Sequence, residues 1–573
     1  MSLARAWSVA LIGLDGRLVE VEAAIGSGLP RTVLVGLPDA SLYEARDRCK
    51  AAVASCGIQW PGSLVTINLS PAALPKAGSG YDLAIIAAVL AAEGLVRKDL
   101  LDDTVLVGEL GLDGRVRAVR GVLPAVLAAS DKKFRRVIVP LQVAAEAELV
   151  DEMRVVGVGN LAQLMAVLNG EPVPDLPPGG LAGEARERGR APDHPRDLAD
   201  VAGQVEARWA LEVAAAGRHH LHLHGPPGVG KTMLAERLPG LLPDLPITAA
   251  LQVAAVHSLA GLGVPDGLDR RPPYAAPHHS ATMASVIGGG PRMARPGSIS
   301  IAHAGVLFMD EAPEFNPRVL DAMRTPLELG EVLIGRSEVQ ARFPAQFQLV
   351  LASNPCPCGL ATTPGARCTC APMTVRRYAE RLSGPIKDRI DISQLLLPMR
   401  KSYLRQALQQ AETTARVADR VAEARARQVR RFADTPWSAN GEASGAHLRT
   451  ELPPPDGLEA IERAVSRGRL SPRGVDKVLR VAWTLADLAG HDKPGAGDVQ
   501  AALAMRHGDT GHGGVGSGGI GQLTVAQPGI GQAPVIGLSS TSGELPARTH
   551  PSGRADSDPR PDLDPRAGSE EAS

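Results

Sequence analysis

The stretch GPPGVGKT at residues 225–232 constrains the fold of this 573-residue chain more than any other feature. It lies within HLHLHGPPGVGKTMLAERL (220–238), between an apolar run and an amphipathic segment. The order strand, glycine loop, helix and the pattern G-x-x-x-x-G-K-[ST] predict a phosphate-binding loop. Backbone N–H groups cradle the phosphates, Lys231 supplies positive charge, and Thr232 offers a hydroxyl to Mg²⁺. We therefore expect ATP and Mg²⁺ to be bound by Gly225, Pro226, Pro227, Gly228, Val229, Gly230, Lys231 and Thr232.

A phosphate loop needs a second strand that ends in carboxylates, and AGVLFMDEAPEF (304–315) provides it. Four apolar residues, 306–309, lead directly into Asp310 and Glu311. We expect Asp310 to join the Mg²⁺ shell and Glu311 to orient and polarise the attacking water. Acidic residues at strand ends are common, so this pair indicates a nucleotide site only in combination with the phosphate loop upstream.

A third buried strand is predicted in FQLVLASN (347–354), and it ends at Asn354. In this architecture the strand lies between the two strands just described. Asn354 can then contact the γ-phosphate or the attacking water. The plain alternative is that Asn354 forms a turn, since asparagine is common where strands end.

Four of the six cysteines follow that strand, in LASNPCPCGLATTPGARCTCAP (351–372). Two C-x-C pairs separated by nine residues place four thiols on one loop, and Zn²⁺ prefers four sulfurs in a tetrahedron. A structural zinc ion is therefore our leading interpretation. Reduced thiols without metal and a redox-active disulfide are the alternatives. The candidate ligands are Cys356, Cys358, Cys368 and Cys370.

Composition and charge limit which partners the chain is expected to bind. The net charge is −1, so binding of nucleic acid would have to use local patches or the geometry of an oligomer. No run approaches the roughly 18 apolar residues of a membrane span. The short apolar stretch in the N-terminal MSLARAWSVALIGLDG is followed by the charges of Asp15 and Arg17, and it predicts a strand rather than a signal peptide. We expect a cytoplasmic protein with no membrane contact, in a compartment where thiols stay reduced.

Breaks in composition divide the chain. Residues 171–197 are rich in Pro, Gly and charge and predict a linker, and residues 508–573 have the composition of a disordered tail. Strand-like and helix-like runs alternate in 1–170 and 198–400, which predicts two mixed α/β domains. Residues 401–507 show helical apolar spacing and predict a helical domain.

The motifs occur in an order that resembles AAA+ ATPases, and more finely the YifB/ComM family of magnesium-chelatase-like AAA+ ATPases. The segments that carry the resemblance span the chain from residue 1 to about 506, and only the tail falls outside it. The most specific are APHHSATMASVIGGGPRMARPGSISIAHAGVLFMDE (276–311), PLELGEVLIGR (326–336), NPCPCG (354–359), LSGPIKDRIDI (382–392) and LSPRGVDKVLRVAWTLADL (470–488).

The resemblance implies a P-loop AAA+ α/β/α core, a helical lid and a homo-hexameric ring with ATP at the subunit interfaces. Arg389 in GPIKDRIDI matches the arginine finger that reaches into a neighbour's site, and Arg473 in LSPRG matches the sensor-2 arginine of the lid. Arg324 and Arg336 are further interface candidates. A guanidinium in this role neutralises charge that develops on the γ-phosphate.

Two further segments, 278–297 and 326–345, resemble elements that point into the ring pore of related motors. Arg292 and Arg295 lie on a Gly/Pro-rich frame in the first segment and would suit a grip on phosphates. An ordinary surface loop is the alternative.

Residues 73–94 and 107–130 resemble the Lon-type protease domain, which uses a Ser–Lys dyad. The nucleophile position falls on Gly80, with Ser79 one residue early, and the lysine position falls on Leu123. Because a serine without a nearby base is inert at neutral pH, we expect a Lon-like α/β domain without proteolysis. A new dyad of Ser79 and Lys76 is the alternative.

Taken with the resemblance, the site residues imply an ATP-driven motor on DNA, with helicase or branch-migration activity in recombination or natural transformation. Single-stranded or branched DNA would be bound independently of sequence, because aromatic residues make up only 3% of the chain and base stacking is disfavoured. The arginine-rich helix expected at 416–432 would either line the DNA path or be a solvated face. The alternatives are a chelatase-type or chaperone-like motor that remodels a protein, and a non-hydrolysing ATP-binding scaffold.

Overall fold

The computed structural model describes most of the chain up to residue 508. Its described residues are 2–36, 40–72, 74, 76, 78–176, 196–264, 267–290, 294–335, 340–362, 367–398 and 411–508. Several predicted features lie outside this part of the chain: Arg292, Arg336, most of the linker, and the tail beyond residue 508. None of the helices in the described ranges is long and apolar enough to cross a membrane.

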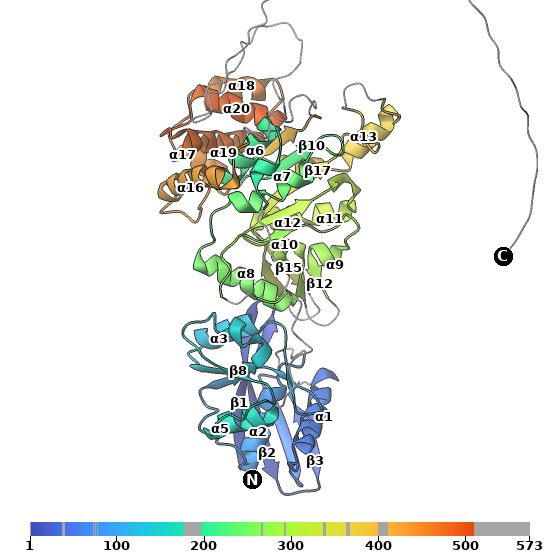
Figure 1. Cartoon of the computed structure of the whole chain (residues 1–573), viewed down its shortest axis with the longest axis vertical. Helices are drawn as coiled ribbons and strands as arrows, with labels where there is room; N and C mark the ends of the chain where they lie inside the picture. The colour runs from blue at the N-terminus through green and yellow to red at the C-terminus, as the bar shows by residue number, and fades with distance from the viewer. Residues whose placement is uncertain are drawn as a thin grey trace, which may run out of the picture. The chain divides into compact units, whose positions relative to one another are not determined.

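A seven-stranded mixed sheet forms the first folded block (Figure 1). Along β2, Val19, Val21 and Ala23 are fully buried while the intervening side chains are not, which is the alternation expected of a strand with one covered face. β1 and β2 form a long antiparallel hairpin, and β1, β5, β8 and β9 pair in parallel. The order is β3 (Arg31–Val35), β4 (Leu64–Ser70), β2 (Asp15–Gly26), β1 (Ser2–Ile12), β5 (Thr104–Leu106), β8 (Arg136–Pro140) and β9 (Arg154–Val158).

Helix α2 (Asp82–Glu93) is the central helix of this block. Its sequence DLAIIAAVLAAE is apolar on all sides, and every residue from Asp82 to Ala92 is buried. A helix of that kind is stable only inside a core. Asp82 is paired there with Arg48, at 2.7 Å. The other helices of the block are α1 (Ala40–Ser55), α3 (Val122–Asp131), α4 (Ala144–Ala147) and α5 (Leu161–Asn169).

A five-stranded parallel sheet organises the second block, and it carries the phosphate loop. Strand β17 is buried at every position, as expected for a parallel strand covered on both faces. It lies between β14 and β10, which is the arrangement predicted for the third strand. The order is β11 (Tyr274–Ala275), β14 (Val306–Met309), β17 (Gln348–Ser353), β10 (Leu221–His224) and β18 (Ile392–Leu395).

Short helices and two hairpins complete this block. Both hairpins fall in the segments expected to be pore elements, and their tips lie outside the described residues. The hairpins are β12 (Gly288–Gly289) with β13 (Arg295–Pro296), and β15 (Glu331–Gly335) with β16 (Gln340–Pro344). The helices are α6 (Val205–Gly217), α7 (Lys231–Ala235), α8 (Ile247–Ala260), α9 (Met283–Val286), α10 (Ser298–Ile301), α11 (Pro317–Ala322), α12 (Arg324–Leu329), α13 (Pro372–Glu380) and α14 (Gly384–Arg389).

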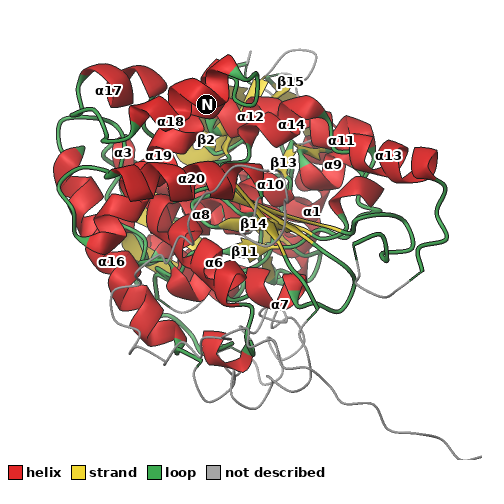
Figure 2. Cartoon of the chain, turned by 90° about the horizontal axis from the view of Figure 1, so that it is seen from above, coloured by secondary structure: helices red, strands yellow, loops and turns green. Residues whose placement is uncertain are grey.

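The third block is helical, as predicted, and α19 is its centre. Helix α19 begins after Ser471, whose hydroxyl accepts from the N–H of Gly474, and it ends before Gly490 in the left-handed conformation. Its Trp483 is almost fully buried. Helix α19 contacts α16, α17 and α20 (Figures 1 and 2). The helices are α16 (Thr414–Arg431), α17 (Gly445–Thr450), α18 (Leu458–Ser466), α19 (Pro472–Ala489) and α20 (Ala496–His507).

Candidate functional site

The phosphate loop connects β10 to α7, which begins at Lys231. Gly228 and Gly230 have φ values of 77° and 96°, in the left-handed region that side-chain-bearing residues rarely adopt. The loop can therefore turn its backbone N–H groups toward a common centre only because these positions are glycine. The first turn of α7 adds the partial positive charge of a helix N-terminus.

Lys231 is held by three oxygen acceptors at this loop. Its Nζ donates to the carbonyls of Gly225 at 2.7 Å and Pro226 at 2.9 Å, and to Oδ1 of Asn354 at 3.0 Å. The side chain is buried, and burial lowers the pKa of its ammonium group while the carboxylates of Asp310 and Glu311 oppose that shift. The structure therefore brings the predicted lysine and asparagine into direct contact, across neighbouring strands.

Thr232 and Asp310 meet on the other side of the loop. The Thr232 hydroxyl donates to Oδ2 of Asp310 at 2.7 Å, so two of the predicted Mg²⁺ ligands are already adjacent. The second oxygen of Asp310 accepts from the backbone N–H of Glu311 at 2.9 Å. A hydroxyl beside a carboxylate is the oxygen donor set that Mg²⁺ uses in nucleotide sites, so these residues fit the ion.

Glu311 follows Asp310 in the chain, and its backbone is in a strained conformation. Its φ is +51°, which is uncommon for any residue other than glycine and is often found at functional sites. Its carboxylate lies 3.4 Å from Nδ1 of His279, and about half of the Glu311 side chain is exposed. Sequence reasoning did not find the His279 contact, because the two residues are far apart in the chain.

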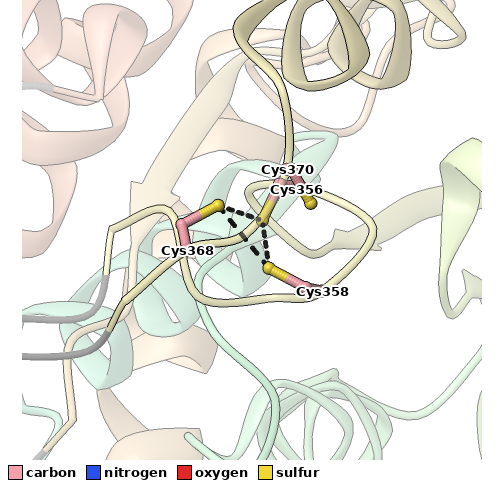
Figure 3. A group of neighbouring side chains, drawn as sticks. All are labelled: Cys356, Cys358, Cys368 and Cys370. Atoms are coloured by element: carbon pink, nitrogen blue, oxygen red, sulfur yellow. Dashed lines mark hydrogen bonds between the residues drawn. The ribbon is translucent and has the colours of Figure 1, made fainter.

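The four cysteines gather into one cluster after β17, as Figure 3 shows. The Cys356 sulfur lies 3.3 Å from that of Cys358 and 3.8 Å from that of Cys368, and the latter two sulfurs are 3.6 Å apart. All four sulfurs lie within 4.8 Å of one another. Tetrahedral Zn²⁺ with bonds of about 2.3 Å holds its sulfurs about 3.8 Å apart, so the cluster has the size of a four-thiolate zinc site.

The four thiols form no disulfide, and the pKa of one of them is lowered. All four are unpaired cysteines in the structure, without a disulfide. A hydrogen bond from the backbone of Leu360 and another from the Cys356 thiol stabilise the Cys358 thiolate and lower its pKa to about 6. The thiolate is the form that binds metal.

The cysteine loop packs directly on the phosphate loop. Gly359 has φ +77°, and a Cβ at this position would lie 2.9 Å from Cγ of Pro227 and closer still to its Cδ. Only a residue without a side chain therefore permits this approach. The contact joins the segment that follows Asn354 to the loop that holds Lys231. No sequence motif signalled it.

Arg389 and Arg473 lie together in a different place. Arg389 ends α14, donates to the carbonyl of Pro385 at 2.7 Å and pairs with Glu328. Arg473 lies 3.9 Å from the same Glu328 and 3.7 Å from Asp388. Both arginines line a cleft of about 770 Å³, and the described residues that form this cleft include none from 225–232.

The remaining arginine candidates have different surroundings. Arg324, at the start of α12, and Arg295, in β13, are exposed. Helix α16 uses most of its arginines internally, which gives that helix a packing role. Arg420 pairs with Glu212 at 2.7 Å, and Arg425 donates to the carbonyl of Ala215 at 2.8 Å. Arg427 and Arg431 bond to Asp487.

In the first block, Ser79 and Lys76 are bound to different partners. The Ser79 hydroxyl donates to Glu109. The Lys76 ammonium is buried and donates to the carbonyls of Pro71 at 2.6 Å and Leu74 at 3.1 Å. Leu123, at the position expected for a dyad lysine, is fully buried in α3. These contacts give Lys76 a structural role.

Comparison with known families finds three models that together cover most of the chain. "Subunit ChlI of Mg-chelatase" matches residues 21–143, "Magnesium chelatase, subunit ChlI" matches residues 197–403, and "Magnesium chelatase, subunit ChlI C-terminal" matches residues 411–506. The second of these contains the phosphate loop, both carboxylates, Asn354, the cysteine cluster and Arg389.

Curated relatives align over nearly the same length. An uncharacterized protein of Mycobacterium tuberculosis is 51% identical over 508 residues, which is 88% of this chain and 99% of the relative. Competence protein ComM of Haemophilus influenzae is 39% identical over 86% of this chain and 95% of its own length. Uncharacterized protein YifB of Escherichia coli is 39% identical over 88% of this chain and 97% of its own length.

Proposed function

Because the chain belongs to the YifB/ComM family of magnesium-chelatase-like AAA+ proteins, we propose that it is an ATP-driven DNA motor. It hydrolyses ATP within a homo-hexameric ring and uses the energy for helicase or branch-migration work in recombination or natural transformation. The observation that carries the proposal is the set of contacts from Lys231 to Asn354 and from Thr232 to Asp310, at the carboxyl ends of three adjacent strands.

The contacts suggest how each residue acts on the nucleotide. Lys231 exchanges its carbonyl partners for phosphate oxygens, and the glycine-supported N–H groups of the loop bind the same phosphates. Thr232 and Asp310 would hold Mg²⁺, which neutralises phosphate charge when it is bound. Glu311 accepts a proton from the attacking water, and Asn354 orients that water or the γ-phosphate.

The position of Arg389 and Arg473 supports a site that is completed by a second copy. Both arginines share Glu328 and line a cleft formed without the phosphate loop of their own chain. In a ring, that cleft would face the nucleotide of the neighbouring protomer. An arginine supplied in this way accelerates hydrolysis by roughly 10³–10⁵.

DNA is the proposed substrate because a 39% identical relative is named as a competence protein. A net charge of −1 and few aromatic residues favour a local, sequence-independent grip on phosphates. The exposed Arg295 is a candidate for this grip.

The first experiment measures ATP hydrolysis with single-stranded DNA, forked DNA or no DNA, and strand displacement on a four-way junction. We expect stimulation by DNA and displacement that is lost in Lys231→Ala. Hydrolysis without stimulation by any DNA would contradict the DNA proposal and would favour a motor that remodels a protein. Absence of hydrolysis under all conditions would leave an ATP-binding scaffold.

We further propose that Cys356, Cys358, Cys368 and Cys370 bind one structural Zn²⁺, which stiffens the loop that touches Pro227. Four thiolates leave no open coordination position, so the ion would be structural rather than catalytic. Elemental analysis of protein purified without chelators should give one zinc per chain. The pair Cys358→Ser and Cys368→Ser should lose the metal, while Cys56→Ser, at an exposed cysteine elsewhere, should keep it. Metal-free protein with four reactive thiols would overturn this proposal.

The first block is proposed to be non-proteolytic. Gly80 and Leu123 occupy the two dyad positions, and Lys76 is bonded to carbonyls. Casein should remain intact with ATP present, for both the wild type and Ser79→Ala. Cleavage that disappears in Ser79→Ala would contradict this assignment.

A further inference from the structure

A buried ion pair joins α19 to the segment that follows Arg389. The ammonium of Lys477 lies 2.9 Å from Oδ1 of Asp391, and the two side chains are 14% and 2% exposed. Burial alone would raise the pKa of Asp391, but Lys477, His219, His220 and Arg480 together outweigh it, and the pKa lies below its usual range. Burial lowers the pKa of Lys477 while the Asp391 carboxylate opposes that shift, and the nucleotide chemistry described above uses neither residue.

The same lysine holds the backbone of Arg389. Lys477 Nζ donates to the carbonyl oxygen of Arg389 at 3.0 Å. Asp391 in turn accepts from the backbone N–H of His220, next to the strand that leads into the phosphate loop, at 2.8 Å. The Lys477–Asp391 pair thus fastens α19, the end of α14 and the start of β10 to one another.

A second cation from the helical block acts at the adjacent carbonyl. Arg506, in α20, donates to the carbonyl of Ile390, and its guanidinium lies 3.7 Å from Asp388. The last carbonyls of a helix lack intrahelical partners and favour nearby cations. Lys477 and Arg506 supply those partners where α14 ends, so the position of Arg389 depends on the helical block.

The contacts of the Arg389 side chain indicate why the position of its backbone matters. Its guanidinium is bound to Glu328 and to the carbonyl of Pro385, and its buried Nε has no hydrogen-bond partner among the residues that the structure describes. A guanidinium that must leave Glu328 to reach a neighbour's phosphate can be aimed correctly only if its backbone is fixed.

We propose that Lys477 is a positioning residue, which fixes the Arg389 backbone to the helical block so that the guanidinium reaches the nucleotide of the adjoining protomer. This inference rests on the proposed function, in which Arg389 acts in trans. It also gives the helical block a direct mechanical link to the neighbouring site, because movement of α19 displaces Arg389.

The test uses rings assembled from two defective variants. Arg389→Ala protomers retain the nucleotide site but supply no guanidinium, and Glu311→Gln protomers supply Arg389 but do not hydrolyse. Mixing them should restore ATP hydrolysis. Adding Lys477→Met to the Glu311→Gln protomer should then lower kcat by about tenfold or more, because misplacing a catalytic group by about 1 Å can cost 10²-fold. The KM for ATP should not change, since the nucleotide binds to the other protomer.

Three controls separate positioning from loss of structure. Lys477→Arg in the same protomer should recover much of the activity, because it keeps the charge and donors. Lys477→Met leaves Asp391 charged and unpaired, which is destabilising, so Lys477→Met with Asp391→Asn removes both charges and should show the same loss of kcat. Lys493→Met, which breaks an exposed ion pair with Asp456, should have no effect.

The mixing experiment separates the role of Lys477 from the shared nucleotide site. If Glu311→Gln protomers that carry Lys477→Met, or Lys477→Met with Asp391→Asn, restore hydrolysis as well as Glu311→Gln protomers that keep Lys477, the positioning role is overturned while the shared site stands. If mixing restores nothing even with Lys477 intact, the proposed shared site is wrong, and the role of Lys477 falls with it.

Discussion

At the scale of single residues, the proposed function assigns nucleotide binding to Lys231 and hydrolysis to Glu311. Lys231 is already held among oxygen acceptors, the Gly225 carbonyl and the Asn354 amide oxygen among them, and phosphate oxygens can replace these with little rearrangement. Glu311 is partly exposed, has a strained backbone and lies beside His279, so it is placed to act on water rather than to bind phosphate. Binding and hydrolysis should therefore be separable by mutation.

Lys231→Ala is expected to weaken ATP binding strongly, whereas Glu311→Gln should bind ATP like the wild type and hydrolyse it about 10²–10⁴ times more slowly. A fluorescent ATP analogue measures binding, and phosphate release measures hydrolysis. Lys132→Ala, at an exposed lysine, is the control. Tight binding by Lys231→Ala, or wild-type hydrolysis by Glu311→Gln, would be inconsistent with these roles.

His219 gives the fold a predictable dependence on pH. Its side chain is fully buried, Nε2 lies 2.7 Å from the Thr484 hydroxyl, and burial lowers its pKa to about 3. The unfolded chain binds a proton near pH 6.5, but the folded chain does so only near pH 3. The stability that depends on neutral His219 is therefore complete above about pH 6.5 and is lost as the pH falls below it.

Between pH 7 and pH 5 this histidine should cost about 2 kcal/mol of unfolding free energy. His219→Gln removes the titration and should make stability less dependent on pH over this range. Urea unfolding at pH 7 and pH 5 measures the difference. Equal pH dependence in the two proteins would show that His219 has the same pKa in the folded and the unfolded chain.

At the scale of elements, β17 and the loop after it connect three parts of the site. The strand positions Asn354, the following residues form the cysteine cluster, and Gly359 rests against Pro227 of the phosphate loop. The sequence predicted the strand and the four clustered thiols, because both follow from local pattern. It could not predict the contact with Pro227, which depends on how two loops from adjacent strands fold toward each other.

Gly359→Ala should weaken ATP binding, because the added Cβ collides with Pro227 and displaces the phosphate loop. Gly57→Ala is a matched control. Gly57 also has a left-handed φ, +73°, but no atom of the described ranges lies within 4 Å of its Cβ position. Both changes strain the backbone by about 1 kcal/mol, and Gly359→Ala adds the collision with Pro227, so its thermal stability should fall further. Equal ATP affinity in both variants would show that the cysteine loop does not support the site.

At the scale of the whole molecule, the sequence predicted two mixed α/β blocks and a helical block, and the structure has them. Periodicity and strand-ending motifs are strong signals for such elements. Sequence spacing did not place Arg389 and Arg473 beside Glu328, because that grouping joins α12, α14 and α19. The sequence also did not predict that most arginines of α16 bond to other parts of the protein. A run of arginines has the same sequence pattern whether it faces solvent or packs against Glu212 and Asp487.

We propose that each chain contributes two half-sites, one around Lys231 and one around Arg389, and that ATP is hydrolysed where half-sites of two protomers meet. The ATP hydrolysis of mixtures of Glu311→Gln protein and Arg389→Ala protein tests this proposal. Each variant alone should be nearly inactive, and the mixture should regain activity that peaks at intermediate ratios. A mixture no more active than the sum of its two components at every ratio would contradict the claim.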